Sequence, residues 1–172
     1  MRNQKGLTLL EVLAAIAILS GVVITVAALI NSSVTSATRE QRKDISVDLA
    51  KTVLEEIKHN LKNTSLASTT LTTLNAKPVN IVINLANLRQ PVAEKTDVAT
   101  FPFTDSGNHI YQIVVSNMPY ANTDNMLTIT DPTDSEKTLN FDITQYFSIV
   151  QVQVTQPQLN VNYVLQSYIE KK

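Results

Sequence analysis

The first hydrophobic run of the chain extends from Leu7 to Ile30, and Glu11 is its one charged residue. These 24 residues would form a helix about 36 Å long, enough to cross a hydrocarbon core of about 30 Å. Arg2 and Lys5 precede the run, so the distribution of positive charge predicts a cytoplasmic amino terminus and an external chain after Ile30. We therefore expect residues 7–30 to be a membrane-spanning helix.

From residue 31 the pattern becomes that of an amphipathic helix, which we expect to end at residue 62. No Gly or Pro interrupts residues 34–62, and apolar residues recur there at spacings of three and four. Charged residues mark the opposite face, where Lys51 and Glu55 form an i, i+4 pair. We expect His59 to be exposed to solvent. The predicted buried face consists of Ile45, Val47, Leu49, Ala50, Val53, Leu54, Ile57 and Leu61.

Alternation of apolar and polar residues, typical of half-buried strands, begins after a connector rich in Ser, Thr and Asn (residues 63–77). The alternating runs are residues 79–85, 109–118, 125–130, 138–143, 150–154 and 159–169. Pro157 separates the last two runs, which we expect to form a hairpin. One apolar face per strand predicts an antiparallel sheet covered by the amphipathic helix. The fold class is therefore α+β, with a long amino-terminal helix packed on a β-sheet head within residues 63–172.

The composition excludes several classes of function. Cysteine is absent, so the chain has no disulfide, thiol nucleophile or cysteine metal site. Three glycines in the whole chain leave little room for a phosphate-binding loop. The net charge is −1, and without Arg2 and Lys5 the chain has 12 basic residues against 15 acidic ones. A mildly acidic chain lacks the basic surface that nucleic acid requires, so we expect no direct nucleic-acid binding.

We predict no catalytic site and no cofactor, because the common catalytic motifs are missing. His109, in "DSGNHIYQ", is the one candidate base of the sheet region, and this stretch is more typical of a turn before a strand. Asp131, Asp134 and Glu136 have oxygen ligands of the kind that calcium binds. Their spacing matches no EF-hand, and Asp-Pro and Asp-Ser are common in turns, so calcium is the less favoured interpretation.

Two ordinary interpretations of residues 7–30 leave Glu11 unexplained. A secretory signal peptide has an apolar region of roughly 7–15 residues, and this run is longer, with a poor cleavage site near Ala28. A signal anchor fits the length. Neither accounts for a carboxylate at bilayer depth, which costs at least roughly 2.5 kcal/mol, or for the abrupt junction at Lys5 and Gly6.

The stretch "KGLTLLEVLAAIAIL" resembles the processing and methylation signature of type IV prepilins and of the pseudopilins of related secretion and DNA-uptake machines. The resemblance implies that residues 1–6 are a leader peptide, which a prepilin peptidase removes by cleavage between Gly6 and Leu7. Leu7 would then be N-methylated. The resemblance also implies that Glu11 is an assembly residue, whose carboxylate reaches the terminal amine of a neighbouring subunit. Cleavage would place an amine at Leu7 one helical turn from Glu11, because residues i and i+4 share a face.

The function implied is that of a non-enzymatic structural subunit, a minor pilin or minor pseudopilin, of a pilus, secretion or competence filament. Its partners would be the prepilin peptidase, other pilin subunits contacted through their amino-terminal helices, and the cytoplasmic membrane. Residues 7–30 would span that membrane once and then enter the core of a cell-surface or extracytoplasmic filament. Many major pilins have a proline in this helix, whereas here no proline precedes Pro78 and Gly21 is the one weak point of the run. The alternative is a membrane-anchored extracytoplasmic binding domain that does not assemble.

Overall fold

The computed structural model describes residues 9–63, 65–120, 126–131 and 134–171, except for the side chains of residues 126–127, 131 and 134–137. The chain divides into two compact units, residues 1–41 and 42–172, with the boundary inside helix α1 (Leu9–Leu61). The described part of the first unit is entirely helical.

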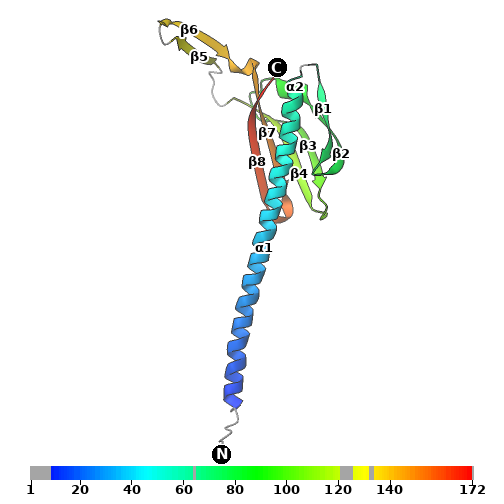
Figure 1. Ribbon diagram of the computed structural model, residues 1–172, viewed down its shortest axis with the longest axis vertical. Coiled ribbons are helices and arrows are strands. Elements are labelled where there is room, and N and C mark those ends of the chain that lie inside the picture. Colours follow the sequence, from blue (N-terminus) through cyan, green and yellow to red (C-terminus); the bar gives the residue numbers. More distant parts are fainter. Residues whose placement is uncertain (1–8, 64, 121–125, 132–133, 172) are drawn as a thin grey trace, which may run out of the picture. The chain divides into compact units, whose positions relative to one another are not determined.

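The second unit contains the remainder of α1 and all the strands. Four strands form an antiparallel sheet in the order β3-β4-β7-β8, and the others pair as β1–β2 and β5–β6 (Figure 1). The α+β class is thus confirmed, although the strands form three sheets. The elements after α1 are β1 (Ser68–Leu74), β2 (Lys77–Asn84), α2 (Leu85–Arg89), β3 (Thr96–Thr104), β4 (Ile110–Met118), β5 (Met126–Asp131), β6 (Asp134–Asp142), η1 (Ile143–Gln145), β7 (Phe147–Gln156), η2 (Pro157–Leu159) and β8 (Val161–Glu170).

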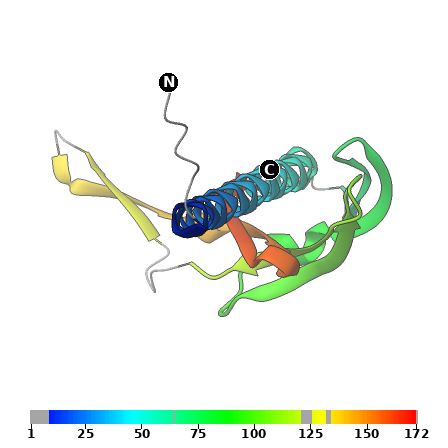
Figure 2. The same ribbon diagram turned by 90° about the horizontal axis from the view of Figure 1, so that it is seen from below.

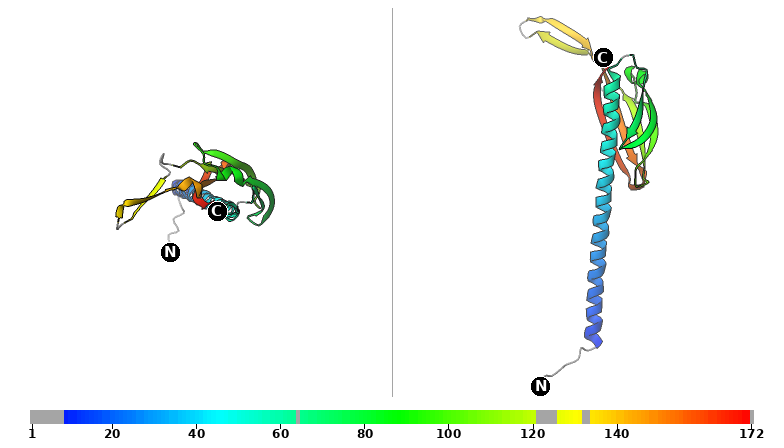
Figure 3. Two further views of the ribbon diagram at one scale, coloured as in Figure 1. Left: turned by 90° about the horizontal axis from the view of Figure 1, so that it is seen from above. Right: turned by 45° about the vertical axis from the view of Figure 1, so that its right-hand side comes forward.

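The inner face of the four-stranded sheet packs against the buried stripe of α1 (Figure 2, Figure 3). The pairing of Val152 with Val115 on one side and Leu165 on the other aligns apolar side chains across the sheet. Each fully buried Leu, Ile or Val stabilises the fold by about 1.5–3 kcal/mol. The buried stripe of α1 consists of Ser46, Leu49, Ala50, Val53, Leu54, Ile57 and Leu61. It matches the predicted face except that Ile45 and Val47 are only half-buried and that Ser46 is buried.

The predicted hairpin of β7 and β8 is confirmed. Pro157 begins the short helix η2, and Asn160 closes the turn in the left-handed region at φ 52°. The alternation in β8 also places Tyr163 and Leu165 on the inner face, as expected. β7 is buried at five successive positions, 148–152, so both of its faces are covered there.

The prediction of a connector over residues 63–77 is wrong for its second half, which is strand β1. Thr69, Leu71 and Leu74 are buried, and a register shift between Leu71 and Thr73 lets both leucines face the core. The β-branched threonines of this stretch favour a strand despite its polarity.

Three further elements differ from the expectation. Leu85, predicted as the end of a strand, begins helix α2 because the side chain of Asn84 accepts a hydrogen bond from the Asn87 backbone N–H. The edge strand β3, which the sequence analysis did not identify, buries Phe101 and Phe103. The run predicted over residues 138–143 ends at Asp142, and Ile143 begins η1.

Arg89, at the end of α2, holds the carboxyl end of α1. Its guanidinium donates to the carbonyl oxygens of Leu61 (3.1 Å), Asn63 (2.6 Å) and Leu66 (2.6 Å). The last carbonyls of a helix lack partners within the helix and carry partial negative charge, so a cation is favourable there. α2 is fixed in turn by Asn117, whose side-chain amide donates to the carbonyls of Asn87 and Gln90.

Replacement of Arg89 by Ala should lower the free energy of unfolding by about 2–3 kcal/mol, because three carbonyls lose a charged donor. The measurement is urea denaturation of the full chain in detergent, followed by the near-ultraviolet circular dichroism of its tyrosines. The matched control is Lys51→Ala, which removes the same charge from an exposed site on α1 and should change stability by less than about 0.5 kcal/mol. Equal midpoints for the two variants would show that Arg89 does not hold the helix end.

Candidate functional site

The amino-terminal part of α1 exposes apolar side chains on every side. Leu9 and Leu10 are 79% and 77% exposed, and none of the residues from 9 to 41 is buried. The helix contains a window of mean hydropathy 2.7, long and apolar enough to cross a membrane. A helix that is apolar on all sides is stable in lipid or packed among other helices. This segment is therefore suited to a membrane or to an assembly of helices, and not to a single chain in water.

Glu11 lies in the first described turn of α1. A carboxylate at this end of a helix is favoured by the partial positive charge of the backbone N–H groups. Gly6 and Leu7, the predicted cleavage residues, lie outside the described part of the chain.

Two hydroxyl side chains within the apolar run, those of Ser20 and Thr25, find acceptors in the helix itself. Ser20 donates to the carbonyl of Ile16 at 2.7 Å, and Thr25 donates to the carbonyls of Gly21 (2.8 Å) and Val22 (2.9 Å). Because a hydroxyl without a partner is costly in lipid, these bonds make the segment compatible with a bilayer.

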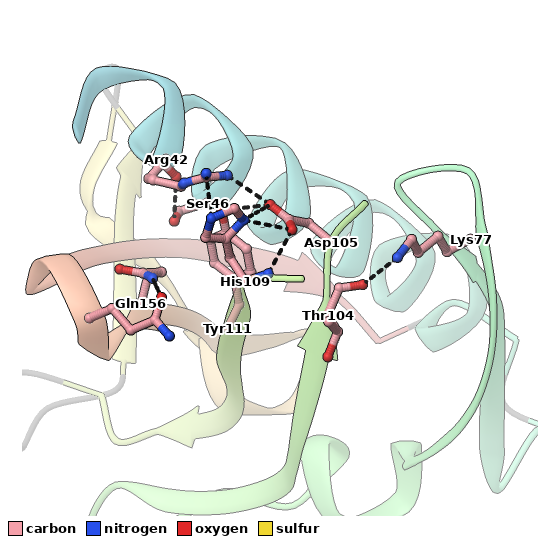
Figure 4. Close-up of polar contacts among 9 residues, drawn as sticks. Arg42, Ser46, Lys77, Thr104, Asp105, His109, Tyr111 and Gln156 are labelled. Carbon is pink, nitrogen blue, oxygen red and sulfur yellow. Dashed lines mark hydrogen bonds and ion pairs between the residues drawn. The ribbon is translucent and has the colours of Figure 1, made fainter. Parts of the chain in front are cut away.

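A buried polar cluster joins α1 to the turn between β3 and β4 in the second unit (Figure 4). Arg42 donates from Nη1 to Asp105 Oδ2 at 2.9 Å, and its Nη2 lies 2.7 Å from His109 Nε2. His109 Nδ1 lies 3.0 Å from Asp105 Oδ1, which also accepts the His109 backbone N–H at 2.9 Å. The side chains of Arg42 and Asp105 are 11% and 5% exposed. We call Arg42, Asp105, His109 and Tyr111 the polar cluster.

The hydrogen bonds of the polar cluster leave His109 unsuited to act as a base. Since a guanidinium only donates, Nε2 of His109 must accept from Arg42, and Nδ1 then carries the proton that it donates to Asp105. Both ring nitrogens therefore have hydrogen-bond partners. His109, the candidate base of the sequence analysis, thus has a structural role in this turn. Asn108 turns the chain here in the left-handed region at φ 60°, and a Cβ on Gly107 would meet the His109 ring at 2.5 Å.

The same contacts determine the charge state of the cluster. Burial opposes ionisation of Asp105, but the hydrogen bonds from the His109 backbone and ring outweigh it and hold the pKa of the carboxyl below its usual 3.8. Burial raises the pKa of Tyr111 above 10.0, and its hydroxyl lies 3.4 Å from Asp105 Oδ2. At neutral pH the cluster is thus a carboxylate that accepts hydrogen bonds from three side chains.

The less favoured calcium interpretation stays a prediction. The side chains of Asp131, Asp134 and Glu136 lie outside what the structure describes. Among the described residues, no group of three or more His, Cys, Asp or Glu side chains is placed to hold a metal ion.

Comparison with known protein families gives one match. The model of the prokaryotic N-terminal methylation motif matches residues 1–30. The amino-terminal segment therefore carries a prepilin-type N-terminal methylation motif. The match covers the basic start, Gly6, Glu11 and the apolar run, and it does not extend to the head. No curated protein and no solved structure matches the chain.

The sequence analysis did not identify Arg42 and Asp105 as partners. The available signal was the position of Arg42, four residues before Ser46 and so on the buried side of α1. A charge on a buried helix face requires an opposite charge nearby. The sequence alone does not say which of its 15 acidic residues supplies that charge, because the pairing spans 63 positions.

Asp105→Asn should lower the free energy of unfolding at pH 7 by about 3 kcal/mol, because Arg42 stays buried without its anion. The pKa of Asp105 is lower in the folded chain than in the unfolded chain. Its ionised form therefore stabilises the fold above pH 3.8, and this stabilisation is lost as the pH falls through the folded pKa. The variant should therefore lose less stability than the native chain as the pH falls below about 4. Urea denaturation at several pH values measures both effects, with the exposed helix residue Asp44 changed to Asn as the control. A parallel pH dependence in native and variant chains would contradict the assignment.

Proposed function

We propose that this protein is a structural subunit of a type IV pilus or of a related secretion or DNA-uptake pseudopilus. In this proposal prepilin peptidase cleaves the chain between Gly6 and Leu7, Leu7 is N-methylated, and the subunit enters the filament through α1. The observation that carries the proposal is a single carboxylate, Glu11, within a helix that is otherwise uncharged, mostly apolar and exposed over residues 9–30.

The energetics of Glu11 favour assembly over simple anchoring. A carboxylate in lipid is costly unless a positive group compensates it, and anchoring alone would be served better by an uncharged residue. Cleavage after Gly6 would create such a group, the α-amine of Leu7. In a filament the amine of a neighbouring subunit would compensate the carboxylate and would also set the axial register between the two helices.

The position in the cell follows from the same segment. Before assembly the chain would be held in the cytoplasmic membrane by its apolar helix, with the amino terminus inside and the head outside, because the positive charges precede the run. The sequence also favours a minor rather than a major subunit, and the number of copies per filament would decide between them. The second candidate is a membrane-anchored binding domain, which the exposed apolar helix fits equally well but Glu11 does not.

Glu11→Gln should reduce the amount of protein recovered in sheared filament fractions by at least about tenfold, since the amide cannot compensate a neighbouring amine. Membrane insertion should be unchanged or improved. The control is Glu40→Gln, which removes a charge from an exposed position of the same helix beyond the apolar run. Normal recovery of the Glu11 variant would favour the anchored binding domain.

Processing is tested by the intact mass and amino-terminal sequence of the membrane-extracted protein, from cells with and without prepilin peptidase. We expect an N-methylated Leu7 terminus only when the peptidase is present. A chain that begins at Met1 in both strains, or one cleaved near Ala28, would contradict the proposal.

A further inference from the structure

Five charged side chains are exposed on α1 just beyond the apolar run, those of Arg39, Glu40, Lys43, Asp44 and Asp48. None of them forms an ion pair with a described residue, whereas two lysines near the carboxyl end of the helix do. The five charges are therefore available to a partner outside the chain.

Charges of one sign share a side of the helix. Residues four apart lie on one side, so Arg39 and Lys43 form what we call the basic row, and Asp44 and Asp48 form the acidic row. Successive residues are rotated by about 100°, so the two rows lie on different sides of α1. Like charges four residues apart are unfavourable within a helix, and opposite charges on another helix would relieve that repulsion.

We infer that the acidic row of one copy pairs with the basic row of a second copy, whose α1 lies parallel to the first. The complementary charges name the occupant, because each copy carries both halves of the contact. A contact between unlike sides of identical subunits can repeat from one copy to the next without closing, as a filament requires. The inference rests on the proposed function and requires that at least two copies be adjacent in the filament.

The residue spacings of the two rows agree with the alignment that Glu11 requires. In the proposed function Glu11 of one copy meets the α-amine of Leu7 of its neighbour, so the parallel helices are displaced by four residues, about 6 Å. Each residue of the acidic row follows a residue of the basic row by five positions. The same displacement therefore brings opposite charges of two copies to within one residue, about 1.5 Å along the axis.

A displacement of one residue is the competing alignment. It would bring Glu40 beside Arg39 of the neighbour and Asp44 beside Lys43 of the neighbour. It would also leave the neighbour's amine about three residues from Glu11 along the axis, so the Glu11 contact favours the longer displacement. In that longer displacement Glu40 faces no residue of the basic row.

The paired rows contribute more to alignment than to affinity. An exposed ion pair is worth little by itself, and the exposed apolar part of α1 supplies the larger contact between helices. Like charges brought together across an interface cost considerably more than one exposed pair contributes. Reversal of charges is therefore a more sensitive test than their removal.

The test reverses one charge in each row, in cells where the variant is the only copy of this chain. Lys43→Asp alone and Asp48→Lys alone should each lower recovery in sheared filament fractions by at least about fivefold. The two changes together in one chain should restore recovery to within about twofold of the native chain. Residues five apart do not face each other in one helix, so this restoration would come from a contact between copies.

The single variants should fold normally. Each reversal places opposite charges four residues apart within α1, Lys43→Asp beside Arg39 and Asp48→Lys beside Asp44, which favours the helix. The amount of each variant in the membrane fraction checks this directly.

The matched control is the double variant Lys43→Asp with Asp44→Lys, which exchanges the same charges between positions one residue apart. Recovery should stay low, because this variant fits only the competing alignment.

Three outcomes would overturn the inference while the native chain is recovered in filaments: normal recovery of both single variants, no restoration by the Lys43→Asp and Asp48→Lys pair, or restoration by the control pair alone. The second outcome would show that the neighbour is a different subunit. In each case the proposed function would stand. Absence of the native chain from filaments would instead refute the proposed function and this contact together.

Discussion

The change of hydrophobic pattern along α1 is the constraint on which the rest of the molecule depends. Over residues 9–30 the helix is apolar on all sides, whereas from Ser46 to Leu61 only one stripe is buried. The first pattern requires lipid or other helices around it, and the second requires a single sheet. One continuous helix is thus suited to two environments, and the amino-terminal methylation motif of residues 1–30 belongs to the first of them.

Within the second unit, two arginines link the two ends of the α1 segment to the rest of the unit. Arg42 binds the turn between β3 and β4 through Asp105. Arg89 binds the carbonyl of Leu61 at the end of the helix and the carbonyls of Asn63 and Leu66 just beyond it. In both arginines the terminal Nη atoms make the contacts, and the buried Nε has no hydrogen-bond partner in the described structure. The apolar stripe supplies most of the stabilisation, and these directional bonds determine how the strands and α2 lie against the helix.

The periodicity of the sequence was sufficient to predict α1, the β7–β8 hairpin and the inner face of β8. It failed for β1, where threonines replace the apolar residues of an ordinary strand, and for β3, where Phe101 and Phe103 are the two buried residues. It also placed Leu139 on a sheet covered by the helix, whereas β5 and β6 pair separately and leave Leu139 exposed. Glu11 could be identified from the sequence because a charged carboxylate is unexpected within an apolar helix. The polar cluster could not, because Arg42 and Asp105 meet only through the tertiary fold.

The central claim is that Glu11 compensates the terminal amine of a neighbouring subunit, and a zero-length cross-link tests it most directly. Isolated filaments would be treated with a hydrophobic carbodiimide, which reaches carboxylates within an apolar core, and the amino-terminal peptides would be analysed by mass spectrometry. We predict an amide bond between the Glu11 carboxyl of one chain and the α-amine of another, detected as two linked peptides. A single peptide closed on itself between Leu7 and Glu11, or no product at Glu11, would contradict the account.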